Sequence, residues 1–225
     1  MKGDTITMIK PGMFGKNVPA DNRRMDFDFG NEQILFLKKR PDILFIGDSI
    51  TQLWDIHAYF ETDKFLVNRG IGGDCSTYLL KRFDADCIQL KPKKVILMIG
   101  TNDIARTADD VWWRTKGEAE ETVLSDYMNN IKQIVKKCDD SGTELILCSV
   151  IPSDIAAPFD KEKRWRMTAK MNEFLKGLGK QYIDYHSVLT KDGKTLPYDL
   201  SPDGIHPNAE AYAMMAEVLK KNIEF

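Results

Sequence analysis

Apolar and polar residues are arranged along this chain in blocks that predict strands separated by helices. Mainly apolar segments that suit strands lie at 42–46, 65–67, 95–99, 145–151 and 182–185, and the run 43–46 is unbroken, as expected of a strand buried on both faces. Segments with helical spacing of apolar residues lie at 31–39, 76–90, about 120–138, about 161–178 and from Pro207 onward. Strands joined through helices pair in parallel by right-handed crossovers. The pattern therefore predicts a three-layer α/β sandwich with about five parallel strands.

The first thirty residues do not follow this pattern. They are polar, and Pro11-Gly12 and Gly15 favour turns. We expect an irregular N-terminal arm over residues 1–30 and one folded domain over residues 31–225. Neither an internal repeat nor a linker divides the longer segment.

The composition argues against several classes of protein. The chain has 225 residues, of which 43% are hydrophobic, and its formal net charge is −2. These values suit an ordinary globular domain and give no electrostatic reason to expect a nucleic-acid or membrane partner. No apolar run approaches the ~18 residues that span a bilayer, and residues 1–10 lack an apolar signal core. We expect a cytoplasmic protein, unless a leader has been removed.

The cysteines and glycines point to no cofactor. Cys75, Cys87, Cys138 and Cys148 form no C-x-x-C pair, and the three histidines are too widely spaced for a structural zinc site. The segment 70–75 has a cysteine where a dinucleotide fingerprint needs its last glycine, and no phosphate-binding loop occurs. We therefore expect isolated thiols in a reducing compartment, with no metal and no cofactor.

Small polar clusters follow the first three apolar runs. They are Gly47-Asp-Ser49, Gly70-Ile-Gly-Gly-Asp74 and Gly100-Thr-Asn-Asp103. The carboxyl ends of parallel strands meet at one edge of a sheet, where open α/β sheets bind ligands, so we expect the clusters to lie together. One cluster offers a hydroxyl, one offers bare backbone amides and one offers a side-chain amide. Together they can supply a nucleophile and an oxyanion hole.

Each cluster also has a plainer explanation. Ser49 precedes a helix-compatible segment and suits an N-cap. Gly72 and Gly73 suit a tight turn, and Asn102 suits a cap or a turn. Cys75, which lies close by, is a weaker rival nucleophile. Because the clusters converge, we interpret Ser49 as the nucleophile, and the glycine amides and the asparagine as oxyanion donors.

The base that the serine needs is predicted in the C-terminal loop. Residues 201–207 read Ser-Pro-Asp-Gly-Ile-His-Pro, in which Pro-Asp-Gly favours a turn and Pro207 restricts the backbone of His206. Asp203 stands three residues before His206, close enough to fix the tautomer of the ring. His186 and Asp184 form the competing pair, but no proline-stiffened turn holds them. We prefer His206 as the general base and Asp203 as its partner.

Substrate contacts are expected in the loops that follow the third and fourth strands. Those loops carry aromatic and cationic side chains that can stack on a sugar or hold an anionic group, although core packing or subunit contacts explain them equally well. These residues are Trp112, Trp113, Arg114, Arg164, Trp165 and Arg166. The chain has no long apolar lid segment, which favours small-molecule esters over long-chain lipids.

Four segments of the chain resemble the sequence blocks of the GDSL, or SGNH, hydrolases. They are residues 47–50, 70–74, 100–103 and 203–206, with Ile50 in place of the leucine that gives the family its name. The blocks occur in the order of the family and span most of the chain. The resemblance implies a flavodoxin-like sandwich that hydrolyses esters through an acyl-enzyme.

The resemblance also implies a role for each site residue. Ser49 would be the nucleophile, His206 the general base and then acid, and Asp203 the group that orients the histidine. The backbone amides of Ser49 and Gly73 and the side chain of Asn102 would form the oxyanion hole. Gly73 is preferred to its neighbour because the glycine of the family directly precedes the aspartate of that block.

The Gly-Ile-Gly-Gly-Asp form of the second block narrows the resemblance. It is similar to the platelet-activating-factor acetylhydrolase-like branch, which includes bacterial acylhydrolases and carbohydrate O-acetyl esterases. This branch implies short-chain acyl esters as substrates, including O-acetyl groups on carbohydrates. Two other classes stay open: a catalytically silent binding module on the same fold, and a nucleotide- or flavin-binding domain.

Overall fold

A five-stranded parallel sheet forms the centre of the protein. The computed structural model describes residues 7–15, 18–109, 116–155 and 160–225. The strands are β1 (Ile43–Gly47), β2 (Leu66–Gly70), β3 (Lys94–Met98), β4 (Glu144–Cys148) and β5 (Gln181–Ile183). They pair in the order β2-β1-β3-β4-β5, and every pair is parallel. The predicted α/β class and strand number are confirmed.

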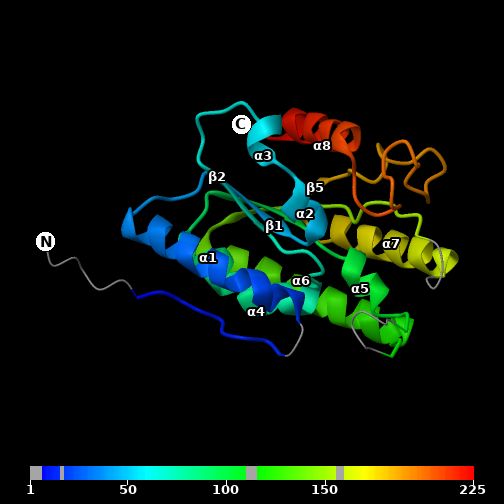
Figure 1. Ribbon diagram of the computed structural model, residues 1–225, viewed down its shortest axis with the longest axis horizontal. Helices are drawn as coiled ribbons and strands as arrows, with labels where there is room; N and C mark the ends of the chain where they lie inside the picture. Colours follow the sequence, from blue (N-terminus) through cyan, green and yellow to red (C-terminus); the bar gives the residue numbers. More distant parts are fainter. Residues whose placement is uncertain (1–6, 16–17, 110–115, 156–159) are drawn as a thin grey trace, which may run out of the picture.

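Helices cover both faces of this sheet (Figure 1). One face carries α1 (Pro19–Phe36), α4 (Ser76–Asp86), α6 (Glu120–Ser141) and α7 (Lys161–Lys176). The other carries α2 (Ser49–Leu53), α3 (Ile56–Tyr59) and α8 (Ala209–Asn222). The short helices η1 (Ile88–Leu90) and α5 (Thr101–Ala105) follow α4 and β3.

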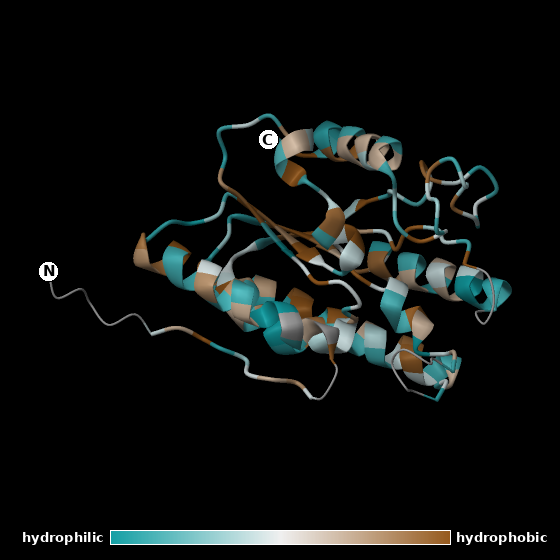
Figure 2. Cartoon of the chain, in the orientation of Figure 1, coloured by the Kyte–Doolittle hydropathy of each residue, from teal (hydrophilic) through white to brown (hydrophobic). Residues whose placement is uncertain are grey.

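Alternation along the strands supplies a separate core to each face. Leu44 and Ile46 pack in the core under α4 and α6, whereas Ile43 and Phe45 pack in the core under α8. Figure 2 shows the hydrophobic strands between helices in which hydrophilic and hydrophobic residues alternate. Within the described ranges, no helix is long and apolar enough to cross a membrane.

The predicted irregular N-terminal arm is wrong over residues 19–30, because α1 occupies them. This helix runs from Pro19 to Phe36, so it begins twelve residues before the helix predicted at 31–39. The side chains that it turns inward include polar ones, and apolar periodicity therefore could not reveal it. The buried polar side chains of α1 are Asp21, Arg24 and Asn31.

The last helix begins at Ala209 and not at the predicted Pro207. The side chain of Asn208 accepts a hydrogen bond from the Ala211 amide at 3.0 Å and caps the helix. Pro207 therefore lies before the cap, where its fixed φ restricts the loop that carries His206. The same loop contacts the chain after β4, since the Asp154 amide donates to the Gly204 carbonyl at 2.8 Å.

Two glycines at strand ends let α2 lie directly against the sheet. A Cβ atom on Gly70, the last residue of β2, would stand 2.2 Å from the backbone nitrogen of Gln52 in α2. A Cβ atom on Gly47, the last residue of β1, would stand 2.4 Å from Oγ1 of Thr51 in α2 and 2.0 Å from the carbonyl oxygen of Met98 in β3. Because a side chain fits at neither position, glycine there sets the height of α2 above the sheet.

Candidate active site

Ser49 lies in the first turn of α2, directly after β1 (Figure 1). The N-cap of this helix is Asp48, whose carboxylate accepts a hydrogen bond from the Ile50 amide at 2.9 Å. Ser49 is therefore the first helical residue and not the N-cap that the plainer explanation proposed. An amide at this position has no intrahelical acceptor, so that of Ser49 is available to an anion.

The C-terminal loop brings His206 to the serine. The Nε2 atom of His206 lies 2.9 Å from the Ser49 hydroxyl, and its Nδ1 atom lies 2.6 Å from Oδ2 of Asp203. The other carboxylate oxygen of Asp203 accepts hydrogen bonds from the amides of Ile205 at 2.9 Å and His206 at 2.8 Å. It also accepts one from the Ser201 hydroxyl at 3.1 Å. Residues 157 positions apart thus form a continuous serine–histidine–aspartate relay.

The hydrogen bonds of Asp203 keep it ionised. Partial burial acts to raise the pKa of this carboxyl group, but the bonds from the His206 ring and from the His206 and Ile205 amides outweigh burial and hold the pKa well below its ordinary value. A carboxylate at Nδ1 fixes the tautomer in which Nε2 is free to accept a proton from the serine.

The two neighbouring amides of the glycine loop differ in their hydrogen bonding. The Gly72 amide donates to the side-chain oxygen of Gln52 at 2.6 Å. The Gly73 amide has no acceptor among the described residues, and its φ of 76° is one that glycine adopts most readily. Asn102, in α5, is held by a 2.9 Å hydrogen bond from its side-chain nitrogen to the carbonyl of Asp74. One N–H of that amide is left for a further acceptor.

The competing nucleophile, Cys75, and the competing base, His186, lie in different surroundings from Ser49 and His206. Cys75 is buried, and burial, with Asp103 and Asp74 adding to it, raises the pKa of its thiol to about 12. A thiol with such a pKa stays protonated and is a poor nucleophile. His186 donates its backbone amide to the Ser149 hydroxyl, and burial lowers the pKa of its ring. Within the described part of the chain, His206 alone places a ring nitrogen against the hydroxyl of the serine.

Three buried carboxyl groups belong to the segments that follow β1, β2 and β3. Burial raises the pKa of Asp48 to about 7, with the charges of Asp74 and Asp103 adding to the effect. Burial likewise raises the pKa of Asp74 and of Asp103 to about 6. Asp103 accepts hydrogen bonds from the amide of Ser76 at 2.9 Å and from its hydroxyl at 2.5 Å. Near neutral pH, Asp48 is therefore partly uncharged, which limits the negative charge next to an oxyanion.

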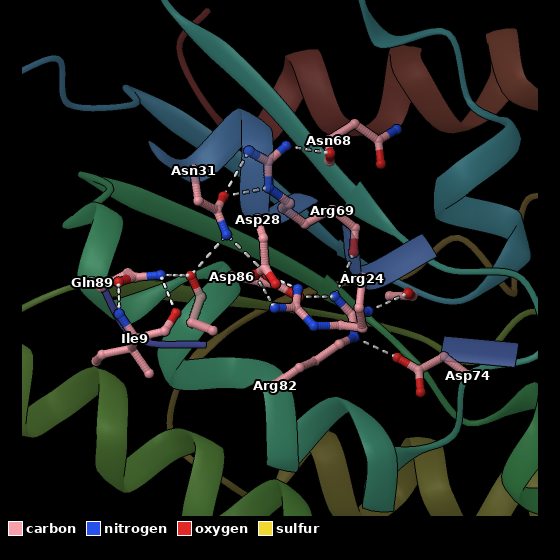
Figure 3. Close-up of polar contacts among 12 residues, drawn as sticks. Ile9, Arg24, Asp28, Asn31, Asn68, Arg69, Asp74, Arg82, Asp86 and Gln89 are labelled. Atoms are coloured by element: carbon pink, nitrogen blue, oxygen red, sulfur yellow. Dashed lines mark hydrogen bonds and ion pairs between the residues drawn. The ribbon is translucent and has the colours of Figure 1, made fainter. Parts of the chain in front are cut away.

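A buried arginine, which the sequence analysis did not single out, pairs with one of these carboxyl groups. Arg82 of α4 is fully buried and pairs with Asp74 at 2.7 Å and with Asp86 at 3.0 Å. Asp86 also pairs with Arg24 of α1, so the network spans two helices of one face (Figure 3). The sequence hinted at these ion pairs through the spacing of Asp74, Arg82 and Asp86, but that spacing does not show that this face of α4 is buried.

A cavity of about 260 Å³ opens beside Gly73 and Asn102. Its wall includes the Tyr78 ring and the guanidinium of Arg106, which donates to Glu118 at 2.6 Å and to Asp126 at 2.8 Å. Glu118 and Asp126 line the cavity as well, together with Cys75, Thr77 and Ala105. Among the described residues, no group of three or more His, Cys, Asp or Glu side chains is arranged to hold a metal ion.

The residues expected to contact substrate are placed only in part. Trp112, Trp113 and Arg114 lie outside the described residues. Arg164 is buried and donates to the Ser153 hydroxyl at 3.0 Å, and Arg166 pairs with Glu120 at 2.6 Å. Trp165 lies under the ammonium group of Lys194, 5.3 Å from its ring centre. A role of these side chains in substrate binding stays a prediction.

Known proteins resemble this chain in both sequence and fold. The model of the GDSL-like Lipase/Acylhydrolase family matches residues 45–214. The platelet-activating factor acetylhydrolase IB subunit alpha2 of Rattus norvegicus is 36% identical over 101 residues, 43% of this chain and 43% of that protein. The Gallus gallus form is 27% identical over 195 residues, 82% of this chain and 77% of that protein. The chain thus matches less than half the length of the first relative.

Solved structures share the fold of this chain. A GDSL-like lipase from Bacteroides thetaiotaomicron superposes with a TM-score of 0.68 and 25% identity, covering 87% of this chain and 96% of that one. An acetylxylan esterase from Geobacillus stearothermophilus shares the fold, with a TM-score of 0.62 and 22% identity over 81% of this chain and 94% of that one. The family model covers more than half of the sequence, and it includes the serine, glycine, asparagine and histidine blocks. The chain belongs to the GDSL-like lipase/acylhydrolase family.

Proposed function

We propose that this protein is a serine esterase that hydrolyses short-chain acyl esters, with O-acetylated carbohydrates as the substrate class. The observation that carries the proposal is the relay from the Ser49 hydroxyl to His206 Nε2 at 2.9 Å and from Nδ1 to Asp203 at 2.6 Å. A hydroxyl, a ring base and a carboxylate in this order are the working parts of acyl transfer.

The first half of the proposed reaction forms an acyl-enzyme. The Ser49 oxygen attacks the ester carbonyl carbon while its proton passes to His206 Nε2. The carbonyl oxygen becomes an oxyanion, which accepts hydrogen bonds from the amides of Ser49 and Gly73 and from the Asn102 side chain. The intermediate then collapses, the carbon–oxygen bond to the alcohol breaks, and the alcohol leaves with the proton from Nε2.

The second half releases the acid. Water attacks the acyl-enzyme carbonyl and gives a proton to His206, and the same three donors hold the new oxyanion. Collapse breaks the bond to Ser49, whose oxygen recovers the proton. Asp203 stays ionised throughout and stabilises the imidazolium, in keeping with its lowered pKa.

Two observations favour a small ester with a polar alcohol. The cavity of about 260 Å³ beside the oxyanion donors is below the ~300–1,000 Å³ of pockets for drug-sized ligands, so it suits a small group. Its wall contains Thr77 and the carboxylates of Glu118 and Asp126, which can accept hydrogen bonds from sugar hydroxyls. The matched relatives are named as acetylhydrolases, which supports acetyl as the acyl group.

The test compares p-nitrophenyl acetate, butyrate and octanoate with wild type, Ser49→Ala and Ser187→Ala. Ser187 is an exposed serine outside the relay and provides the matched control. We expect acetate to be the best substrate, Ser49→Ala to lose at least ~10³-fold in kcat and Ser187→Ala to match the wild type. Release of acetate from acetylated xylo-oligosaccharides then tests the carbohydrate. Equal turnover in wild type and Ser49→Ala would overturn the proposal in favour of a silent binding module.

A further inference from the structure

One buried guanidinium holds the supports of all three proposed oxyanion donors. Arg82 is completely buried, and its Nε atom donates to Oδ2 of Asp74 at 2.7 Å. Its Nη2 atom donates to the carbonyl of Gly47 at 3.0 Å. Its Nη1 atom donates to the carbonyl of Arg69 at 2.9 Å and to Asp86 at 3.0 Å. Figure 3 shows Arg82 between Asp74 on one side and Arg24 and Asp86 on the other.

Two of these acceptors, Gly47 and Asp74, are next to parts of the site. Gly47 ends β1 two residues before Ser49, so the bond to its carbonyl fixes the peptide from which the serine turn begins. Asp74 directly follows Gly73 in the glycine loop. The carbonyl of Asp74 in turn accepts the side-chain amide of Asn102 at 2.9 Å. Arg82 therefore connects the serine turn, the glycine loop and, through Asp74, the asparagine.

Stability alone gives a weak account of this arrangement. A buried ion pair contributes little to stability relative to well-packed apolar side chains, because removing the charges from water offsets their attraction. The planar guanidinium does give fixed direction, since its donors point to several acceptors at once. Here the acceptors are two backbone carbonyls near strand ends, one carboxylate in the glycine loop and one carboxylate at the end of α4.

We propose that Arg82 is a positioning residue for the oxyanion hole, which sets the spacing between the serine amide and the glycine loop. The proposal rests on the esterase function proposed above. A lysine at this position keeps a positive charge but has one nitrogen, which cannot reach Gly47, Arg69 and Asp74 together. The three oxyanion donors would then lose their mutual alignment while the charge stays balanced.

The first test compares the kinetics of Arg82→Lys and Arg24→Met with p-nitrophenyl acetate. Arg24 pairs with Asp86 in the same buried network and contacts neither the serine turn nor the glycine loop, so it is the matched control. A misplacement of ~1 Å can cost 10²-fold in rate, so we expect Arg82→Lys to lower kcat by about 10²-fold with KM within about threefold. We expect Arg24→Met to keep the kcat of the wild type at temperatures where it is folded.

The second test needs no esterase activity. Amide hydrogen exchange of the same variants should be faster in Arg82→Lys over residues 47–50 and 70–74, and in Arg24→Met over α1 only. If Arg82→Lys does not fold, Asp74→Asn, which weakens one bond of Arg82, should raise exchange over 70–74 and lower kcat by about tenfold. Equal kcat for Arg82→Lys and Arg24→Met, or unchanged exchange in both loops, would overturn the proposal. A wild type without Ser49-dependent activity would refute the esterase, and hydrogen exchange would still decide the positioning.

Discussion

The contact between Gly70 and α2 allows a sharp test of how the serine is held. An alanine Cβ at this position would stand 2.2 Å from the Gln52 nitrogen and 2.7 Å from both the Gln52 Cα and the Thr51 carbonyl carbon. All three are backbone atoms, so no side chain can rotate away. Real Cβ atoms essentially never come within 3.0 Å of another atom, and α2 must therefore move away from β2 by close to 1 Å in Gly70→Ala.

A movement of this size is enough to break the hydrogen bond between Ser49 and His206. Ser49 and Gln52 belong to the same short helix, so the hydroxyl moves with the backbone that the new methyl group displaces. The 2.9 Å distance from the Ser49 oxygen to His206 Nε2 is an ordinary hydrogen-bond length, and a shift of close to 1 Å away from the ring would take it past the ~3.2 Å limit. We expect kcat to fall by ~10²-fold. Overpacking should also cost ~1–3 kcal/mol in the free energy of unfolding.

Gly30→Ala provides the matched control, because it makes the same chemical change in the interior of α1. A Cβ there would meet only the side-chain Nη2 atom of Arg69, at an ordinary 3.4 Å. Alanine is favoured over glycine inside a helix, so we expect ~0.5–1 kcal/mol of added stability and unchanged kinetics. The assay is p-nitrophenyl acetate hydrolysis with urea unfolding of each variant. Wild-type kcat and unfolding midpoint in Gly70→Ala would refute the reasoning that this contact sets the position of Ser49.

Two further substitutions test separate parts of the site. Asn102→Ala should lower kcat for p-nitrophenyl acetate by ~10²–10³-fold with little change in KM, and a kcat within threefold of wild type would show that this amide is not an oxyanion donor. Asp48→Asn tests the buried carboxyl group: its pKa is about 7 in the folded protein and ~3.9 in the unfolded chain, so the folded state binds the proton more tightly and wild-type stability falls as pH rises through this window. Between pH 5 and pH 8, the melting temperature should fall less in Asp48→Asn than in wild type. In Asp55→Asn, at the exposed cap of α3, it should fall as much as in wild type. An equal fall in all three proteins would contradict the raised pKa of Asp48.

The strands and their polar ends were predictable because their determinants are local. A strand buried on both faces needs a continuous apolar run, and residues 43–46 and 95–98 supply one each. The Ser49 and Asn102 clusters follow such runs directly, so the parallel topology alone brings them to one edge. The pairing of His206 with Ser49 crosses 157 positions, and the stiff loop and the family resemblance pointed to it without giving its geometry.

The features that sequence reasoning missed depend on polar groups buried by distant partners. Arg24 lies on the inner face of α1 because Asp86, 62 positions away, receives its guanidinium. Nothing in a window around residue 24 distinguishes this arginine from an exposed one, so residues 19–30 seemed to lack the apolar face of a helix. Gly73 was preferred to Gly72 on the family resemblance alone, because the contact that occupies the Gly72 amide comes from Gln52, 20 positions earlier in the chain.

The two sides of the site differ in burial, and this difference has a consequence for mutagenesis. The base side lies near solvent, since the side chains of His206 and Asp203 are 33% and 50% exposed. The oxyanion side rests on Asp48, Asp74, Arg82 and Asp103, which are at most 1% exposed. A change at an exposed hydrogen-bonded pair costs little stability, whereas a change that leaves a buried charge without its partner is strongly destabilising. Substitutions of His206 should therefore lower activity in a protein that unfolds like the wild type, whereas substitutions behind the oxyanion donors should alter activity and unfolding together.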